Sequence, residues 1–253
     1  MPSYRSVAIT DVGMKRENNE DSFLVNDDLG LYVVCDGMGG HAGGETASRL
    51  AVQTIERELL SARLRPDDPF ASHAPLAETP LAGALREAVE GACAAVYRTS
   101  KMNPELHGMG TTCISLLVRG EHALIGHVGD SRAYFVRDGE VTQISEDHSL
   151  VNEQVRAGLL TAEEAKVSRL KNIITRSVGF EEDVLVDIFG IETKVGDKLL
   201  LCSDGLANLV DNGEIRDHLV ALPLDLVPEK LIALANARGG DDNITAVAVE
   251  RTA

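Results

Sequence analysis

Short apolar runs separated by glycine-containing turns constrain the fold of this chain more than any other feature. Nine such runs have the length and composition of strands. They are Arg5–Thr10, Phe23–Asn26, Leu31–Cys35, Thr111–Val118, His122–His127, Arg132–Val136, Val184–Ile191, Asp197–Cys202 and Asn243–Glu250. In the middle of the chain three runs follow one another directly, and Asp138-Gly139 predicts a hairpin. This spacing favours antiparallel strands over β-α-β crossovers.

Helical patterns stand between the groups of strands. They cover Gly44–Arg63, Leu81–Lys101, Gly213–Ala221 and Asp225–Ala237. The proline-rich segment 65–80 is interpreted as a loop between two antiparallel helices rather than an interdomain linker, because the elements on either side cannot each build a core. The last strand is expected to complete an earlier sheet. The chain is therefore predicted to be one α+β domain over residues 1–253.

Residues 149–178 differ from the rest of the chain in being polar and only weakly periodic. They contain a short helical pattern followed by a second one, for which Thr161 has the character of an N-terminal cap. We predict that this segment forms a mobile flap.

The charge balance excludes some classes of function. The chain has 253 residues with 24 Lys and Arg against 40 Asp and Glu, a formal net charge of −16. A nucleic-acid partner is not expected, because binding phosphates requires a basic face. No apolar run is long enough to span a membrane, and the N-terminal residues lack a signal core. A cytoplasmic protein without membrane partners is expected.

The four cysteines are widely spaced and form no CxxC pair. They are Cys35, Cys93, Cys113 and Cys202, three of them in apolar strand-like runs. Buried, reduced thiols are the favoured interpretation, ahead of a disulfide framework or a zinc site.

Carboxylates recur at the ends of the apolar runs. They are Glu20, Asp21, Asp36, Asp130, Asp204, Asp241 and Asp242. Taken singly, Asp36-Gly37 and Asp204-Gly205 are typical of turns, and the others of capped turns or solvated loops. Taken together, they would meet where strands end, and like charges gather only around a neutralising partner. Divalent cations with oxygen ligands are that partner, so a two-metal hydrolase is one possibility.

Two further features near these carboxylates have alternative interpretations. Arg16 could hold a phosphoryl group through two parallel hydrogen bonds, or could be a surface arginine paired with Glu17 or Glu20. The glycine-rich run at 36–41 does not match a phosphate-binding loop, and favours close backbone approach with a glycine carbonyl facing a cation. His41, at its end, is either an exposed helix-entry residue or a proton donor.

Eight segments of the chain form a recognisable series: TDVGMKRENNEDSF at 10–23, VVCDGMGGHAGGETAS at 33–48, GMGTTC at 108–113, GHVGDSRAY at 126–134, EDHS at 146–149, NIITRSVG at 172–179, LCSDGL at 201–206 and GGDDNIT at 239–245. In this order they resemble the motifs of bacterial members of the metal-dependent serine/threonine protein phosphatases (PPM family, type 2C). The resemblance implies a β-sandwich of two antiparallel sheets flanked by pairs of antiparallel helices, with a flap. It also implies two or three Mn²⁺ or Mg²⁺ ions at one end of the sandwich.

The resemblance also implies roles for individual residues. Asp36 matches the carboxylate that bridges two metals, and the carbonyl of Gly37 matches a ligand of one of them. The other implied metal-site residues are Asp204 and Asp242 as terminal ligands, Asp130 at a third metal shared with Asp204, and Glu20 and Asp21 around metal-bound water. Arg16 matches the phosphate-binding arginine. Supporting roles are implied for Thr111 or Thr112, for Asn243, and for His148 at the base of the flap.

The implied activity is hydrolysis of phosphoserine and phosphothreonine in proteins by a metal-activated water, without a phosphoenzyme, in a monomer that reverses a cognate Ser/Thr kinase. Two departures from the family pattern affect details. Met38 stands where eukaryotic members have a histidine, so the general acid is either His41 or a metal-bound water. The flap lacks the usual His-Pro ahead of Asn172. The alternatives are a phosphoprotein-binding pseudophosphatase and a dimetal phosphoesterase for small molecules.

Overall fold

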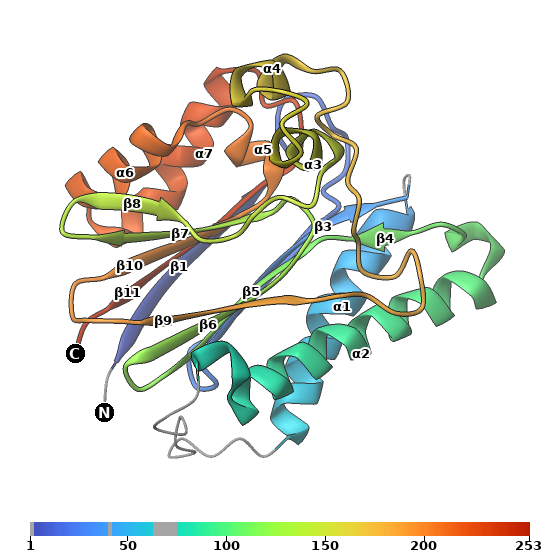
Figure 1. Ribbon diagram of the computed structural model, residues 1–253, viewed down its shortest axis with the longest axis horizontal. Coiled ribbons are helices and arrows are strands. Elements are labelled where there is room, and N and C mark those ends of the chain that lie inside the picture. Colours follow the sequence, from blue (N-terminus) through green and yellow to red (C-terminus); the bar gives the residue numbers. More distant parts are fainter. Residues whose placement is uncertain (1–2, 40–41, 63–74) are drawn as a thin grey trace.

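Two antiparallel sheets lie face to face in this computed structural model, which describes residues 3–39, 42–62 and 75–253 (Figure 1). The first sheet has the order β1 (Tyr4–Asp11), β11 (Ile244–Arg251), β10 (Lys198–Cys202), β7 (Arg132–Arg137) and β8 (Glu140–Gln143). The second has the order β2 (Asp21–Asn26), β3 (Leu31–Met38), β5 (Cys113–Arg119), β6 (His122–Val128) and β9 (Asp187–Glu192), and the short β4 (Gly110–Thr111) pairs with β3. All the pairings are antiparallel.

Both faces of β3 are covered, as its unbroken apolar sequence requires. Tyr32 and Val34 point into the layer between the sheets, where they meet residues such as Leu201 and Val247 of the other sheet. Leu31 and Val33 point the opposite way, toward the helices. Successive side chains of a strand alternate between its faces, so one run of apolar residues supplies two cores.

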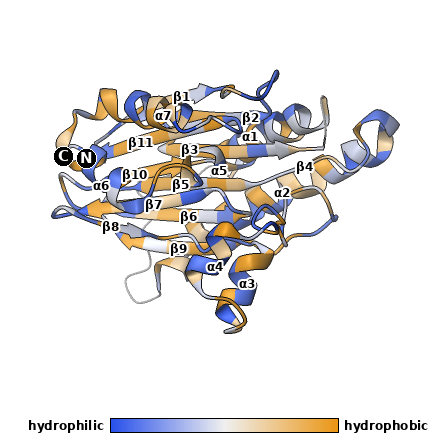
Figure 2. Cartoon of the chain, turned by 90° about the horizontal axis from the view of Figure 1, so that it is seen from above, coloured by the Kyte–Doolittle hydropathy of each residue, from blue (hydrophilic) through white to orange (hydrophobic). Residues whose placement is uncertain are grey.

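Helices cover the outer face of each sheet. α1 (Ala42–Ser61) and α2 (Pro80–Met102) pack on the second sheet, while α6 (Asn212–Ala221) and α7 (Val227–Ala237) pack on the first (Figure 1). Figure 2 shows the central strands of both sheets largely in the hydrophobic colours. Shorter helices are α3 (Leu150–Arg156), α4 (Ala162–Val167) and α5 (Asp204–Ala207), with 3₁₀ turns at Leu76–Glu78, Pro104–Leu106 and Leu224–Leu226.

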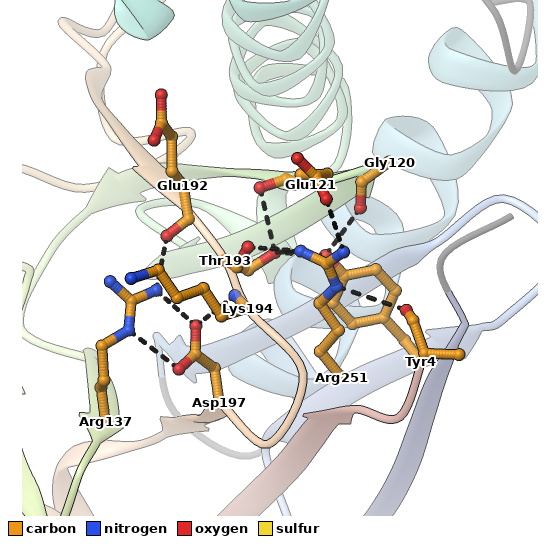
Figure 3. Close-up of polar contacts among 10 residues, drawn as sticks. Tyr4, Gly120, Glu121, Arg137, Glu192, Thr193, Lys194, Asp197 and Arg251 are labelled. Carbon is orange, nitrogen blue, oxygen red and sulfur yellow. Dashed lines mark hydrogen bonds and ion pairs between the residues drawn. The ribbon is translucent and has the colours of Figure 1, made fainter.

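A polar network joins the two sheets where β1 begins and β11 ends (Figure 3). The buried Arg251 donates to the backbone of Thr193 and, at 3.0 Å, to Glu121. The nearly buried Asp197 accepts from Arg137 at 2.9 Å and from the backbone of Lys194. Within this network the buried charges of Arg251 and Asp197 each have a partner of opposite charge, which offsets the cost of their burial.

The predicted architecture is confirmed, with small corrections to the element boundaries. Residues 184–186 precede β9 instead of belonging to it, and residues 224–226 form a 3₁₀ turn before α7. The hairpin at Asp138-Gly139 is confirmed, and both residues have the positive φ that its tight turn requires. Thr161 caps α4 through a reciprocal capping box with Glu164. All four cysteines are buried and free.

The turn interpretation of Asp36-Gly37 is wrong, because both residues continue β3. Asp36 pairs with Asp21 of β2, and Gly37 pairs with Thr111 of β4. Pairing on both sides holds the strand extended beyond its apolar part.

Most of the loop predicted at 65–80 lies outside the described residues, which resume at residue 75. No helix in the described ranges has both the length and the apolar character needed to cross a bilayer.

Candidate metal and phosphate site

The predicted carboxylates lie at the end of the sandwich opposite the polar network of Figure 3. Asp21 begins β2, Asp36 lies near the end of β3, and Asp204 follows β10 as the first residue of α5. Asp130 follows β6, and Asp242 precedes β11. The antiparallel order of the strands therefore brings residues more than 200 positions apart in the sequence to one edge.

Asp21 is the most deeply buried of these carboxylates, with 7% of its surface exposed. Its Oδ2 accepts hydrogen bonds from Ser203 Oγ at 2.9 Å and Thr245 Oγ1 at 2.6 Å. Burial nevertheless raises the pKa of Asp21 to about 7, and the nearby charges of Asp204 and Asp242 act in the same direction. The two hydroxyls stabilise the carboxylate but do not offset the cost of its burial.

The neighbouring carboxylates are shifted in the same direction. Burial raises the pKa of Asp36 well above its usual range, and the charge of Asp21 adds to the rise. Burial and the charge of Asp204 raise the pKa of Asp130 to about 7. The pKa of Asp204 is raised by burial and by Asp242. These mutual effects place the carboxylates in one electrostatic cluster that lacks sufficient positive charge.

Two oxygen atoms in this cluster fit the expectation of a metal site. Oδ1 of Asp21 and Oδ1 of Asp204 are buried and accept no hydrogen bond from any described residue. A buried oxygen of this kind is costly unless a cation or water contacts it. Within the described ranges, no three Asp, Glu, His or Cys side chains are placed so that together they could hold a metal ion. Ions that keep several water ligands, such as Mg²⁺, suit this open arrangement.

The backbone around Gly37 is packed too tightly for any larger residue. A Cβ atom added at Gly37 would lie 2.1 Å from the carbonyl oxygen of Gly44, and one added at Gly44 would lie 2.0 Å from Glu20 Oε2. The amide of Gly37 also donates to the carbonyl of Glu20 at 3.2 Å. The glycines thus let the start of α1 approach β3, which brings Glu20 close to Gly37 and Asp36.

Arg16 contacts the same cluster from its exposed side. Its Nη2 donates to Asp242 Oδ2 at 2.7 Å, and 52% of the side chain is exposed. Although partial burial lowers the pKa of Arg16, the charges of Asp242, Glu20 and Asp36 give a net rise. Among the described residues, the ion-pair partner of Arg16 is Asp242 and not Glu17. The guanidinium is therefore held beside the carboxylates with donors left for an anion.

Three polar residues fix the backbone of the site. Thr111 donates from Oγ1 to the carbonyl of Asp36 at 2.9 Å, and Thr112 Oγ1 accepts from the amide of Asp36 at 3.0 Å. Asn243 Oδ1 accepts from the amide of Glu20 at 2.8 Å, and its Nδ2 donates to two further carbonyls. Both threonines, which the sequence offered as alternatives, thus contact Asp36.

His148 connects the loop before Asp130 to the flap. Its Nδ1 accepts from the amide of Gly129 at 3.0 Å, and its backbone amide donates to the carbonyl of Gly129 at 2.8 Å. Its Nε2 lies 3.0 Å from Asp187 Oδ2, and its carbonyl accepts from the amide of Thr175 at 2.8 Å. These contacts agree with its expected place at the base of the flap.

The sequence did not predict the residues that hold Asp21 and the loop after β6. Ser203 and Thr245 lie inside recognised motifs, yet nothing in the sequence indicated that their hydroxyls face Asp21. Arg132 and Asp147 form a largely buried ion pair at 2.7 Å, and both charges act on Asp130. Arg132 lies in the motif at 126–134 and Asp147 in the motif at 146–149, and this placement could have indicated that they support the site. His41, a candidate proton donor, lies outside the described residues.

Comparison with known proteins identifies the family. The sequence pattern of the family Protein phosphatase 2C matches residues 14–230. The chain belongs to the protein phosphatase 2C family. This confirms the resemblance stated from the sequence, together with the β-sandwich fold and the expectation of a serine/threonine protein phosphatase.

Relatives of this phosphatase 2C chain cover nearly all of it. The serine/threonine phosphatase stp of Listeria welshimeri is 37% identical over 96% of this chain and 94% of its own. The serine/threonine protein phosphatase PstP of Mycobacterium tuberculosis is 37% identical over 97% of this chain and 45% of its own.

Solved structures agree with the fold. The crystal structure of PstP/Ppp from Mycobacterium tuberculosis has a TM-score of 0.87 at 34% identity and covers all of both chains. A second structure, of the PstP catalytic domain in complex with two manganese ions, has a TM-score of 0.86 at 34% identity, again covering all of both chains.

Proposed function

We propose that this phosphatase hydrolyses phosphoserine and phosphothreonine in proteins at the cluster formed by Asp21, Asp36, Asp130, Asp204 and Asp242. The observation that carries the proposal is the pair of buried, unpartnered oxygens of Asp21 and Asp204 beside the exposed Arg16. Carboxylates that lack counter-charge fit divalent cations, and a neighbouring guanidinium with free donors fits the phosphoryl group. The whole chain would act as one catalytic domain.

The residues proposed to hold the cations follow from their placement. Asp36 and the carbonyl of Gly37 would be ligands at the end of β3, and Asp204 and Asp242 would be ligands from the other sheet. Asp130 would hold a third ion, with Glu20 and Asp21 orienting water around the site. When bound, Mn²⁺ or Mg²⁺ would supply an acidified water and charge for the phosphoryl oxygens.

Arg16 would bind and orient the phosphoryl group. Asp242 accepts a hydrogen bond from one guanidinium nitrogen at 2.7 Å, which restricts the guanidinium and leaves its other nitrogens available to an anion. A bidentate contact of this kind orients phosphorus for attack and stabilises the equatorial oxygens. The buried carboxylates would bind the cations while Arg16 binds the phosphoryl anion beside them.

The partners proposed for the chain follow from its chemistry. Its substrates would be proteins phosphorylated by a cognate Ser/Thr kinase, and the chain would act as a cytoplasmic monomer. Its acidic surface offers little to nucleic acids.

The test is turnover of p-nitrophenyl phosphate and a phosphothreonine peptide with EDTA, with Mg²⁺ and with Mn²⁺. We expect turnover of both substrates only with added metal. Asp36→Asn should lower kcat by at least about 100-fold, since it removes charge from the centre of the cluster. Asp130→Ala should lower turnover while two ions still bind, as counted by calorimetry.

The matched control is Asp138→Asn. Asp138 lies in a hairpin turn with a φ of 52°, a conformation that asparagine adopts readily, so this variant should keep full activity. Full activity of Asp36→Asn, or turnover that persists in EDTA, would overturn the metal assignment. Nucleotide hydrolysis without peptide hydrolysis would favour a small-molecule phosphoesterase instead.

A further inference from the structure

An exposed groove begins at the end of β3, next to the proposed metal ligands Asp36 and Gly37, and is not used by the function proposed above. It has a volume of about 450 Å³ and lies between Met38 at the end of β3 and the segment that follows the flap. Its walls include Ile174, Phe180 and Leu185. Phe180 and Leu185 are 66% and 68% exposed, which is unusual for large apolar side chains placed so close together.

The groove is attached directly to the strands of the site. Met38 follows Gly37 in β3, and the amide of Thr111, whose hydroxyl binds the carbonyl of Asp36, donates to the carbonyl of Val178 at 3.0 Å. The amide of Val178 returns a hydrogen bond to Thr111 at 2.8 Å. Val178, which lies between the lining residues Ser177 and Phe180, is thus linked through Thr111 to the backbone of Asp36.

The far side of the same wall is anchored on α2. Gly179 has a φ of 91° and lies so close to Val96 that an added Cβ atom would be 2.1 Å from its side chain. The amide of Gly179 donates to Cys93 Sγ at 3.2 Å, and that thiol donates to the carbonyl of Glu181 at 3.3 Å. The groove is therefore preformed, which lowers the entropic cost of binding.

The charge of the groove is negative. Glu181 and Asp183 line it, and neither forms an ion pair with any described residue. Among the described residues that line it, the basic one is Arg176, which contacts Asp187 at 2.9 Å and the carbonyl of Leu185 at 3.1 Å. The groove thus presents apolar side chains beside two free carboxylates, which complements an apolar residue accompanied by a Lys or Arg.

We propose that this groove selects phosphoprotein segments in which an apolar residue and a Lys or Arg lie within a few residues of the phosphorylated Ser or Thr. The inference rests on the proposed function, because it requires the phosphoryl group to lie beside Arg16 while the flanking residues enter the groove. The chain has a net charge of −16, which opposes the approach of a negatively charged phosphorylated segment. A Lys or Arg of the substrate that contacts the carboxylates of the groove would offset this repulsion.

The experiment compares two phosphothreonine peptides. One carries Leu and Arg within three residues of the phosphothreonine, placed either before or after it, and the other carries Ser and Glu at the same positions. We expect kcat/KM to be about 10-fold higher for the Leu-Arg peptide in at least one placement, the usual effect of burying one apolar side chain. Equal kcat/KM values in both placements would overturn the proposal.

Variants distinguish the groove from a general charge effect. Leu185→Ser should reduce the preference for the Leu-Arg peptide by removing apolar contact, and Asp183→Lys should reduce it by reversing a charge of the groove. The matched controls are Val220→Ser, at a side chain 54% exposed on α6, and Glu87→Lys on an exposed position of α2. Neither control should change the ratio between the peptides. All four variants should hydrolyse p-nitrophenyl phosphate at the wild-type rate, because this substrate is too small to reach the groove.

A second readout separates this inference from the proposed function. If no substrate is turned over, the proposed function fails, and the same peptides are then tested by fluorescence anisotropy for binding. Tighter binding of the Leu-Arg peptide that Leu185→Ser abolishes would support the groove even then. Equal binding of the two peptides, or a preference that Leu185→Ser and Asp183→Lys leave unchanged, would overturn it.

Discussion

The contact between Arg16 and Asp242 shows how a single residue pair prepares the site for an anion. Asp242 holds Arg16 at 2.7 Å although half of the arginine side chain is exposed. An exposed ion pair contributes little to stability, so its value lies in fixing the guanidinium plane. Lysine would retain the charge but would lose the two parallel donors.

We therefore predict that Arg16→Lys raises KM for a phosphothreonine peptide and lowers kcat/KM roughly 10- to 100-fold. Steady-state kinetics at saturating Mn²⁺ measures the effect. Arg5→Lys is the control, because Arg5 forms an exposed pair with Asp225 near the opposite end of β1 and should not affect turnover. Wild-type kcat/KM in Arg16→Lys would exclude bidentate phosphate binding.

At this scale the sequence predicted which residues gather but not how each is held. Asp36 and Asp204 were predicted because each follows an apolar run, and Asp21 because it precedes one, positions that lie at the edge of a sheet. The support of Asp21 by Thr245 was not predictable, since the two residues are 224 positions apart. Asp36-Gly37 resembled a turn because local preference favours one there, and pairing with β2 and β4 overrides it.

Among the structural elements, the flap depends on a few contacts at its base. Ser149 caps α3 and pairs with Ile174, and the amide of Leu150 donates to the carbonyl of Ile173 at 2.8 Å. His148 lies between these contacts and the loop of Gly129, one residue before Asp130. The same side chain therefore positions both the flap and a proposed metal ligand.

We predict that His148→Ala makes residues 150–175 more susceptible to limited proteolysis and lowers kcat more than it raises KM. The reason is that the variant removes the contacts to Gly129 and Asp187 together and leaves a cavity at the flap base. His107→Ala, at an exposed position after α2, is the control. Unchanged cleavage within the flap of His148→Ala would show that other contacts suffice.

Local sequence patterns predicted the helices of the flap, but not the groove next to it. The capping box of α4 lies within four consecutive residues, so the sequence contains all of its parts. The groove beside Met38 depends on long-range pairing of residues 174–185 with β4 and α2, and no local pattern reports such pairing.

For the molecule as a whole, the two ends of the sandwich differ in whether their buried charged side chains have partners of opposite charge. At one end Arg137 and Arg251 pair with Asp197 and Glu121, and the network is complete within the protein (Figure 3). At the other end the carboxylates outnumber the available cationic groups. This asymmetry arises from the order of the strands rather than from any local segment. Because the buried carboxylates repel one another without metal, the acidic end should limit the stability of the metal-free protein.

This asymmetry predicts an unusual pH dependence for metal-free protein. The pKa values of Asp21 and Asp130 are both raised to about 7, above those of the unfolded chain, so their stabilising contribution is present at low pH and is lost as pH rises through about 7. In EDTA, we expect the melting temperature to fall by roughly 5 °C or more between pH 5 and pH 8. Glu214, whose pKa is lowered to about 2, acts oppositely, but its contribution is nearly complete at pH 5.

Differential scanning fluorimetry across this range, with EDTA or with Mn²⁺, tests the prediction. Mn²⁺ should raise the melting temperature more at pH 8 than at pH 5, because protons no longer neutralise the carboxylates at the higher pH. Asp130→Asn in EDTA should flatten the fall, and Asp138→Asn should leave it unchanged. A melting temperature in EDTA that is constant or rises from pH 5 to pH 8 would show that Asp21 and Asp130 are already neutralised by groups of the protein.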